Sequence, residues 1–320
     1  MNFFLKKSNE LTDNEIMQLC DLFHEVFGSS IGVKDFESKF KKTFTGYSYH
    51  GLMIDNEKII GSYSAIPVEY NYFGKKYIFA QSVDTMISKK YRGNVFNLKR
   101  IATLVYKRLA KDGVSFVFGF PNENIYLVRK KILKWQDIGS LDFYILPINI
   151  GSIKAGLKPL NFLSKIYSTF INIFPDLINN VRKFEGDKFN IEKINNISFR
   201  KYRYDKSYNL ITINDNSYSV YKIKKYVNKI SAHLIDVFPL NKAVFESTVK
   251  HILKKEKGKI DEIAFHGKLL FRPINMIKVT GELKPPDIKA SGKILISENI
   301  EENIFNLSNW NMNLSDSDWA

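Results

Sequence analysis

The segment from Gln81 to Phe96 contains the residues whose types and spacing could do chemistry. It passes from an apolar strand pattern through a basic stretch and Gly93 into the apolar stripe of a helix. A strand that turns sharply into a helix leaves backbone N–H groups without partners at the helix N-terminus, where the helix dipole adds positive potential. Gly93 allows a ligand to approach the backbone closely, and the neighbouring lysines and arginine add positive charge. The segment therefore predicts a diphosphate site, and the alternative interpretation is an ordinary basic turn.

Other familiar sites find no support in the sequence. The segment matches neither G-x-G-x-x-G nor G-x-x-x-x-G-K-[ST], the two common nucleotide-binding motifs. The five histidines lie far apart in the chain and lack the spacing of metal ligands. We therefore expect a phosphate-binding loop of another kind and no metal.

Hydrophobic patterns predict the elements that must position this segment. Apolar residues recur at helical spacing before and after it, and three apolar runs between turn residues indicate an antiparallel meander. The expected elements are a helix at 12–27, the meander at 51–88, a helix at 96–112, a strand at 115–120, a helix at 124–135 and a closing strand at 141–148. A helix followed by hairpins is the opening of an α+β fold.

These motifs resemble the GNAT N-acetyltransferase superfamily, in which [Q/R]-x-x-G-x-[G/A] follows a strand and opens a helix that cradles the CoA pyrophosphate. The matching positions here are Lys90, Gly93 and Val95. The Gly-Phe-Pro-Asn turn at 119–122 adds to the likeness. The chain looks like the larger sugar-locus members, which carry two GNAT-like halves. The resemblance implies acetyl-CoA or a longer acyl-CoA as co-substrate, and no metal.

The second half of the chain repeats part of this pattern. A strand at 229–238, a helix at 241–255 and a strand at 262–271 follow the order of the first half, with a chance arrangement as the alternative. This half has no glycine turn between strand and helix, so we expect it to bind no second cofactor. We expect an α+β protein with tandem GNAT-like folds, each a mixed central sheet flanked by helices, the second copy degenerate. The expected domains are an acyl-CoA-binding domain at 1–148, a connector at 149–196 and a degenerate domain at 197–320 that contributes to the acceptor site.

The resemblance also assigns residues to the acyl-CoA site. The strand before the loop would offer backbone groups to the pantetheine arm, and the loop would offer N–H groups to the diphosphate. The positions implied to bind the cofactor are Val83, Thr85, Met86, Ile87, Lys90, Tyr91, Arg92, Gly93, Asn94, Val95, Phe96 and Asn122.

Aminolysis of a thioester needs a neutral amine, a route for its proton and a proton donor for the departing thiolate. Asp84 is the expected base or amine-orienting group, with a structural role in capping the loop as the alternative. Gln81 is expected to orient the acceptor or a water molecule. Tyr126 lies near the position where this superfamily places a thiolate-protonating Tyr, and the alternative is a packed aromatic.

Three residues of the second half are expected to bind the acceptor. His266 lies on the last strand of the repeat and could reach a cleft shared by the two halves, with a structural histidine as the alternative. Asp316 and Asp318 belong to an acidic and aromatic C-terminal segment, where carboxylates would attract a cationic amine unless the segment is frayed.

Composition limits the partners and the compartment. The formal net charge of +15 calls for anionic partners, but the lysines are spread along the chain without a recognisable nucleic-acid-binding motif, which disfavours nucleic acid. No run of about 18 apolar residues predicts a membrane span. The amphipathic pattern at Leu160–Ile178 is interpreted as an interdomain helix, with peripheral membrane binding as the alternative. The single cysteine, Cys20, and the lack of a signal-peptide pattern favour the cytoplasm.

The expected function is therefore transfer of an acyl group from acyl-CoA to the amino group of an amino sugar. The resemblance favours a nucleotide-linked sugar of surface polysaccharide synthesis. One alternative is an aminoacyl or peptide acyltransferase that uses tRNA or a peptide acceptor. The other is a catalytically inactive CoA-binding module, which Val95 supports because it replaces the second small residue of the motif.

Overall fold

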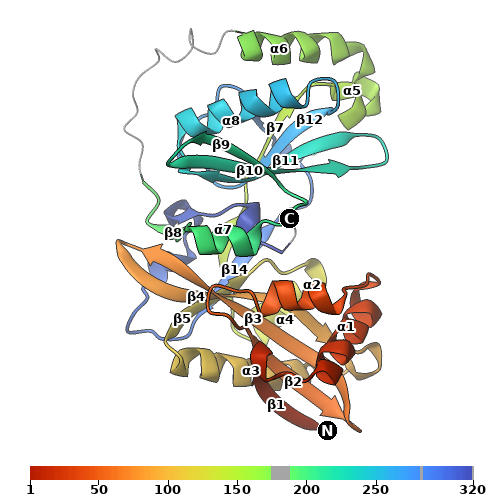
Figure 1. Cartoon of the computed structure of the whole chain (residues 1–320), viewed down its shortest axis with the longest axis vertical. Helices are drawn as coiled ribbons and strands as arrows, with labels where there is room; N and C mark the ends of the chain where they lie inside the picture. The colour runs from red at the N-terminus through yellow and green to blue at the C-terminus, as the bar shows by residue number, and fades with distance from the viewer. Residues whose placement is uncertain (174–187, 282–283, 319–320) are drawn as a thin grey trace. The chain divides into compact units, whose positions relative to one another are not determined.

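The computed structural model describes residues 1–173, 188–281 and 284–318 (Figure 1). The chain divides into two compact units that do not follow the order of the sequence. Unit 1 comprises 1–140, 190–203 and 288–309, and unit 2 comprises 141–189, 204–287 and 310–320. Each unit has one mixed sheet with helices packed on it, which confirms the expected α+β class.

The sheet of unit 1 runs in the order β1-β2-β3-β4-β5-β14-β6, with β8 pairing the end of β3. Its strands are β1 (Asn2–Lys7), β2 (Tyr49–Asp55), β3 (Lys58–Tyr72), β4 (Lys75–Ile87), β5 (Val114–Gly119), β6 (Gln136–Ser140), β8 (Ile191–Lys193) and β14 (Lys289–Ile294). Its helices are α1 (Asp13–Phe27), α2 (Val33–Phe40), α3 (Val95–Lys111), α4 (Glu123–Lys131) and α7 (Ile197–Arg203). β4 and β5 pair in parallel, and α3 is the crossover that this pairing requires.

The meander of β2, β3 and β4 carries the functional segment. Asn56 and Glu57 join β2 to β3, and Phe73 and Gly74 join β3 to β4, all with positive φ. Two-residue turns of this kind match the right-handed twist of antiparallel strands. The meander expected at 51–88 is confirmed, and its last strand leads directly towards α3.

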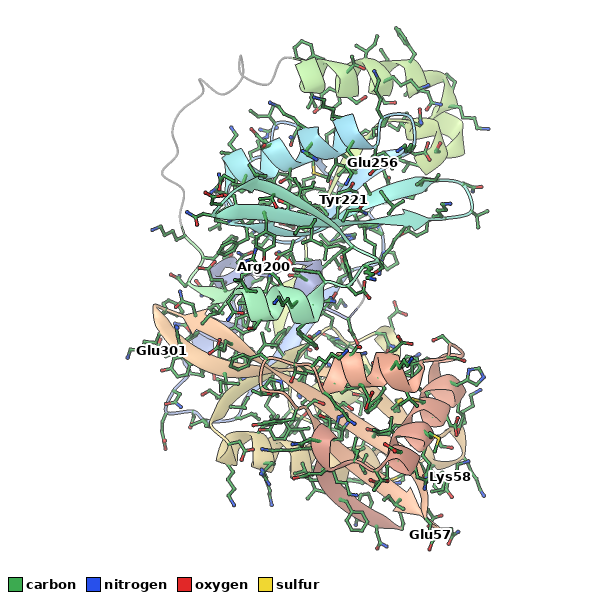
Figure 2. The ribbon with its side chains drawn as sticks, in the orientation of Figure 1. Glu57, Lys58, Arg200, Tyr221, Glu256 and Glu301 are labelled. Carbon is green, nitrogen blue, oxygen red and sulfur yellow. The ribbon has the colours of Figure 1, made fainter. Side chains whose placement is uncertain are left out.

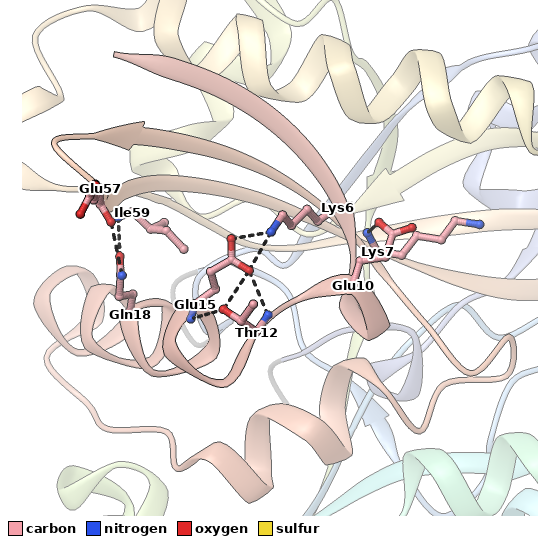
Figure 3. Close-up of polar contacts among 8 residues, drawn as sticks. All are labelled: Lys6, Lys7, Glu10, Thr12, Glu15, Gln18, Glu57 and Ile59. Atoms are coloured by element: carbon pink, nitrogen blue, oxygen red, sulfur yellow. Dashed lines mark hydrogen bonds and ion pairs between the residues drawn. The ribbon is translucent and has the colours of Figure 1, made fainter.

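Polar contacts fix the N-terminal end of α1 to the sheet (Figure 3). Thr12 caps the helix, since its Oγ1 accepts from the Glu15 N–H at 3.3 Å and its own N–H donates to the Glu15 carboxylate at 2.9 Å. Lys6 of β1 donates to both Glu15 oxygens, at 2.6 and 2.9 Å. The Gln18 side-chain oxygen accepts from the Ile59 N–H of β3 at 2.7 Å. A cap of this kind stabilises a helix by about 1 kcal/mol, and here it sets the position of a helix that lines the pocket described below.

α3 covers one face of the sheet with an apolar stripe. The buried residues of this stripe include Leu98, Ile101, Ala102, Val105 and Leu109. β2 approaches the helix closely at Gly51, where a Cβ would lie 2.5 Å from the Ile101 carbonyl oxygen. Glycine at this position therefore lets the helix lie directly on the strand.

The sheet of unit 2 runs in the order β13-β7-β12-β11-β10-β9, and only β11 and β12 pair in parallel. Its strands are β7 (Phe143–Pro147), β9 (Asn209–Asn214), β10 (Ser217–Lys225), β11 (Ile230–Phe238), β12 (Glu262–His266) and β13 (Ile277–Lys278). Its helices are α5 (Ile150–Ile153), α6 (Asn161–Ile173) and α8 (Lys242–Lys255). The Tyr221 hydroxyl of β10 donates to Glu256, just after α8, at 2.7 Å (Figure 2). β11, α8 and β12 thus repeat the arrangement of β4, α3 and β5.

One strand differs from the sequence-based expectation in where it pairs, and the strand found in its place was not expected. The strand expected at 141–148 forms as β7, but it pairs with β12 in unit 2 and does not close the first sheet. β14 lies beside β5 instead. A hydrophobic pattern predicts that a strand forms. In both sheets the second strand of the parallel pair, β5 or β12, has an antiparallel neighbour, and the pattern alone does not show which of the two sheets a strand joins. β12 ends at His266, before the expected residue 271, because the next residue pairs with the C-terminal segment.

The expected connector at 149–196 is divided between the units. It supplies α5 and α6 to unit 2 and β8 to unit 1, while residues 174–187 lie outside the described part. None of the helices in the described ranges is long and apolar enough to cross a membrane. The domain limits at 148 and 196 stay a prediction.

Candidate active site

β4 contains a β-bulge at Asp84. Ser64 of β3 pairs with Val83 and Ser62 pairs with Met86, so β4 has one residue more than β3 in this interval. Asp84 has a φ of 42°, a left-handed conformation that Asp adopts more readily than most other non-glycine residues. Bulges bend a strand and re-aim its side chains, and they are frequent beside active sites. The bulge therefore points the Asp84 side chain in a direction that the regular alternation of side chains along a strand would not give it.

The pairing of β4 with β5 ends just before this bulge. The last pair joins Gln81 to Phe118, and β4 continues along β3 as far as Ile87. Within the described residues, no strand pairs with this edge of β4 after Gln81. This is the edge whose backbone groups were expected to meet the pantetheine arm.

Arg129 of α4 lies beside the open edge. Its side chain is buried, and Nη2 donates to the Ser82 Oγ at 3.1 Å and to the Thr85 Oγ1 at 3.3 Å. The guanidinium lies over the Trp135 ring, 4.5 Å from the ring centroid. A Cβ on Gly119 would lie only 2.8 Å from Nη1, so glycine at the end of β5 leaves room for the guanidinium.

The charge of Arg129 lacks a counter-charge. Its Nε and Nη1 have no hydrogen-bond acceptor, and no carboxylate of the described residues pairs with it. Leaving a buried charge uncompensated costs several kcal/mol. A group of this kind is typical of a site in which the ligand supplies the missing acceptor.

The loop after β4 has free donors where the diphosphate was expected. Lys89–Tyr91 form a single 3-10 turn, and the Asn94 side chain caps α3 by accepting from the Phe96 N–H at 3.0 Å. The N–H groups of Gly93, Asn94 and Val95 donate to no acceptor among the residues that the structure describes. No protein atom lies within 4 Å of the position of a Cβ on Gly93. The N-terminus of α3 is therefore open to an anionic group.

The remaining cofactor candidates lie along the same stretch of chain. The side chains of Val83 and Met86 are buried, which leaves mainly their backbone groups for a ligand. Arg92 Nε donates to the Ile87 carbonyl oxygen at 2.9 Å, and Lys90 is exposed. In the described part of the chain, no group of three or more His, Cys, Asp or Glu residues could hold a metal ion.

A small pocket in unit 1 includes Asp84. Phe23 of α1 and Phe36 and Phe40 of α2 are among its apolar walls, and Ser64 and Asp84 are its polar residues. The Asp84 carboxylate accepts two hydrogen bonds from the Nζ of Lys39 in α2, at 2.7 and 2.8 Å. The Asp84 side chain is 8% exposed. The space among these side chains is about 10 Å³, room for about one water molecule, so a larger ligand needs some of them to move.

His50 of β2 contacts Ser64, one of the polar residues that line the pocket. Its Nδ1 lies 3.0 Å from the Ser64 Oγ, and its Nε2 lies 2.8 Å from the Ser48 Oγ. Burial lowers the pKa of His50 to about 3. The ring is therefore neutral at pH 7 and orients the Ser64 hydroxyl that lines the pocket.

The other catalytic candidates of unit 1 have partners in the protein. Gln81 forms the last β4–β5 pair, at the point where the edge opens. The Tyr126 hydroxyl donates to the two oxygens of Asp137, at 2.9 and 3.0 Å. The Asn122 side chain caps α4 by accepting from the Ile125 N–H at 3.2 Å. Asn122 and Tyr126 thus make structural contacts whether or not they meet a ligand.

The expected acceptor residues of the second half lie in unit 2. His266 is the last residue of β12, its ring is 6.1 Å from that of His233, and burial lowers its pKa to about 4. Asp316 is buried and accepts from the Asn313 N–H at 3.0 Å as part of a capping box. Asp318 is exposed. The C-terminal segment up to Asp318 is therefore largely built into unit 2.

Sequence reasoning missed Lys39, His50 and Arg129. Arg129 begins a run of three basic residues, which usually means a solvated face. It also lies four residues after Ile125 and three before Ile132, a helical spacing that signals the buried face. His50 lies inside an apolar strand pattern, and a strand histidine alone gives no indication of its partner.

Comparison with known proteins agrees with this geometry. Residues 7–130 match the family model described as the acetyltransferase (GNAT) domain. A solved structure of a probable N-acyltransferase from Enterococcus faecalis V583 has a TM-score of 0.60 at 14% identity, over 92% of this chain and 73% of that chain. A GCN5-related N-acetyltransferase from Anabaena variabilis ATCC 29413 has a TM-score of 0.58 at 13% identity, over 92% of this chain and 73% of that chain. Eis1 from Mycobacterium abscessus has a TM-score of 0.56 at 10% identity, over 93% of this chain and 75% of that chain.

No curated protein matches the sequence. At these identities the structural likeness shows the fold, and it extends over both units. It agrees with the α+β architecture of tandem GNAT-like folds that the sequence predicts. The family match begins in β1 and ends in α4, so it includes the bulged strand, the loop and the parallel pair.

Replacing Gly93 by Ala is expected to separate ligand binding from folding. The added Cβ meets no protein atom, so the free energy of unfolding should change by less than about 1 kcal/mol. The same methyl group would stand beside the free N–H groups, and the Kd for acetyl-CoA should rise at least about tenfold in calorimetric titration. Gly119→Ala is the matched contrast, because its Cβ would be 2.8 Å from Arg129 Nη1 and should cost about 1–3 kcal/mol of stability. Equal Kd values for Gly93→Ala and the unaltered protein would place the diphosphate elsewhere.

His50 is expected to make stability depend on pH. Its pKa is about 3 in the folded protein, below the ordinary 6.5, so between these values the unfolded chain binds a proton that the folded chain does not. The contribution therefore lowers stability as pH falls through this window, by up to about 1.4 kcal/mol per pH unit. In urea unfolding over this pH range, the free energy of unfolding should change less steeply with pH for His50→Gln than for the unaltered protein, by the equivalent of about one bound proton. Identical slopes for His50→Gln and the unaltered protein would contradict the neutral state of His50.

Proposed function

We propose that this acyl-CoA-dependent N-acyltransferase, whose residues 7–130 form a GNAT acetyltransferase domain, acts on the amino group of an amino sugar. The proposed acceptor is a nucleotide-linked sugar of the kind used for surface polysaccharide synthesis, and the proposed compartment is the cytoplasm. The Asp84 carboxylate carries the proposal, because it lies at the bulge beside the open edge of β4, where it can attract the ammonium group of the sugar.

Acetyl-CoA or a longer acyl-CoA is the proposed co-substrate. The free N–H groups of Gly93, Asn94 and Val95 would donate hydrogen bonds to its diphosphate at the positive end of α3. The exposed Lys89 and Lys90 add positive charge beside them. The pantetheine arm would follow the open edge of β4 and bring the thioester towards Asp84. The co-substrate supplies the activated acyl group, and no metal is needed.

The proposed reaction is a direct attack of the amine nitrogen on the thioester carbon. An N–C bond forms, the C–S bond breaks, and the nitrogen of the ammonium form loses two protons, one before the attack and one as the amide forms. The first goes to Asp84, and the second balances the proton that the departing sulfur gains. Asp84 would hold the ammonium form of the acceptor and take its proton, after Lys39 releases part of its contact with the carboxylate. Tyr126, whose hydroxyl donates to Asp137 in the structure, would donate a proton to the departing sulfur.

Arg129 is the proposed stabiliser of the negative charge that develops during this attack. The charge appears first on the thioester oxygen and then on the sulfur. The unpaired Nε and Nη1 belong to a guanidinium that Ser82 and Thr85 hold beside the open edge of β4. A donor fixed in a dry site needs no reorganisation when the charge forms. This role also accounts for a buried cation without a carboxylate partner.

An aminoacyl or peptide acceptor, with tRNA or a peptide as the substrate, is the second candidate. The formal charge of +15 supports it, because a positive surface favours binding to a polyanion. Binding to tRNA would fall steeply with salt, whereas a nucleotide-linked sugar would occupy one small site with a weaker salt dependence. The two acceptors can therefore be distinguished in the same assay buffer.

The proposal is tested by release of the CoA thiol in the presence of nucleotide-linked amino sugars, free amino sugars, peptides and aminoacyl-tRNA. We expect turnover with a nucleotide-linked amino sugar, and kcat/KM about 100-fold lower for Asp84→Asn, with the Kd for acyl-CoA unchanged. Asn also tolerates the φ of 42°, so this variant keeps the bulge. Glu37→Gln, at a half-buried carboxylate of α2 that pairs with Lys41, is the matched control and should keep full activity. Turnover confined to aminoacyl-tRNA or peptides would overturn the sugar proposal.

Replacing Arg129 by Met tests the proposed charge stabilisation. We expect kcat to fall about 100-fold while KM for acyl-CoA changes little, because the interaction strengthens only as charge develops. Arg129→Lys keeps the charge but not the planar fork, and should recover part of the activity. Lys131→Met, at an exposed position of the same helix, should leave kcat unchanged. If Arg129→Met turned over at the normal rate, the guanidinium would have a structural role only.

A further inference from the structure

α6 exposes an apolar face at the outside of unit 2. Four of its side chains are about half exposed or more, namely Phe162 (66%), Leu163 (54%), Ile166 (51%) and Phe170 (48%), and Leu160, just before the helix, is 43% exposed. Their spacing places them along one side of the helix. Figure 1 shows α6 as an outer helix of this unit, beside α8.

The opposite side of α6 attaches the helix to unit 2. Ser164, Ser168 and Ile171 are buried there. The Tyr167 hydroxyl donates to the Ile274 carbonyl oxygen at 3.1 Å. The helix is therefore held in place by one face while the other presents large apolar side chains to the solvent. Contiguous exposed apolar surface of this kind marks an interaction site.

The segment that forms this face carries charges of a single sign. The segment 149–173 contains Lys154, Lys158 and Lys165 and no Asp or Glu. All three lysines are exposed. α8, which contacts α6, adds the exposed Lys254 and Lys255 near its C-terminal end. The partner must therefore offer an apolar interior and a negative surface.

We propose that the exposed face of α6 binds peripherally to an anionic membrane surface. The aromatic and aliphatic side chains would enter the boundary between headgroups and acyl chains, and the lysines would lie among anionic headgroups. A second copy of this chain is a poor occupant, because it would bring the same lysines and a net charge of +15 against them. This inference concerns where the enzyme works, and it stands or falls independently of the acceptor.

Co-sedimentation of the full chain with vesicles tests the proposal. We expect binding to vesicles of equal parts phosphatidylcholine and phosphatidylglycerol, little binding to phosphatidylcholine alone, and weaker binding at high salt. The double variant Phe162→Ser/Phe170→Ser should bind at least about tenfold more weakly, because each exposed aromatic contributes apolar area to insertion. Lys158→Glu/Lys165→Glu should weaken binding to the anionic vesicles with the apolar face intact.

The matched control is Val227→Ser, since Val227 is fully exposed in unit 2 and lies outside α6. This variant should bind the vesicles as the unaltered protein does. Thermal unfolding and the thiol-release rate with a soluble acceptor should be the same in all variants, which separates docking from folding and catalysis. No binding of the unaltered protein to anionic vesicles, or equal binding by the Phe162→Ser/Phe170→Ser variant, would overturn the proposal. Self-association in solution that disappears in that variant would also overturn it, because the face would then be a protein interface.

Discussion

The course of β4 is the constraint on which the rest of the active region depends. The strand pairs with β3 almost throughout, but with β5 only as far as Gln81, and the bulge at Asp84 lies just beyond that point. Pairing with β3 holds the backbone in register while the other edge is open. The short turns of the meander and the crossover through α3 bring the three strands together. The open edge is thus a product of the fold and does not depend on a mobile loop.

The cations of the site differ in what surrounds them, and this decides what each can do. The lysines of the loop are exposed, so water and salt screen them, and they can attract an anion without fixing its position. Lys39 is paired with Asp84, so its charge is already compensated within the protein. Arg129 is buried, with two donor nitrogens unpaired. Because little solvent screens it, Arg129 has the strongest effect on charge that develops nearby.

The sequence predicted the elements well because their signals are local. The helix stripe of α3, the turns of the meander and the basic loop with Gly93 can each be recognised within a short window. The contacts that complete the site join distant residues, such as Lys39 with Asp84 and Arg129 with Ser82. Strand partners are equally non-local, since the apolar pattern of β7 suits either sheet, while the residues of β14 form no apolar pattern at all. A pattern of residue types specifies burial and period, but it does not specify which buried surface is the neighbour.

Because of the pairing of β7 and β14, each half of the chain needs a strand from the other half to complete its sheet. β14 comes from near the C-terminus and covers β5, the strand that follows α3 in the acyltransferase domain. β7 comes from the first half and covers β12, the corresponding strand of unit 2. Without β14, the hydrogen-bonding edge of β5 from Phe116 to Gly119 would lose its partner, and an unpaired strand edge invites pairing with another chain. The sheet that contains the residues matched by the family model therefore depends on a strand from the C-terminal part of the chain, although the match ends at residue 130.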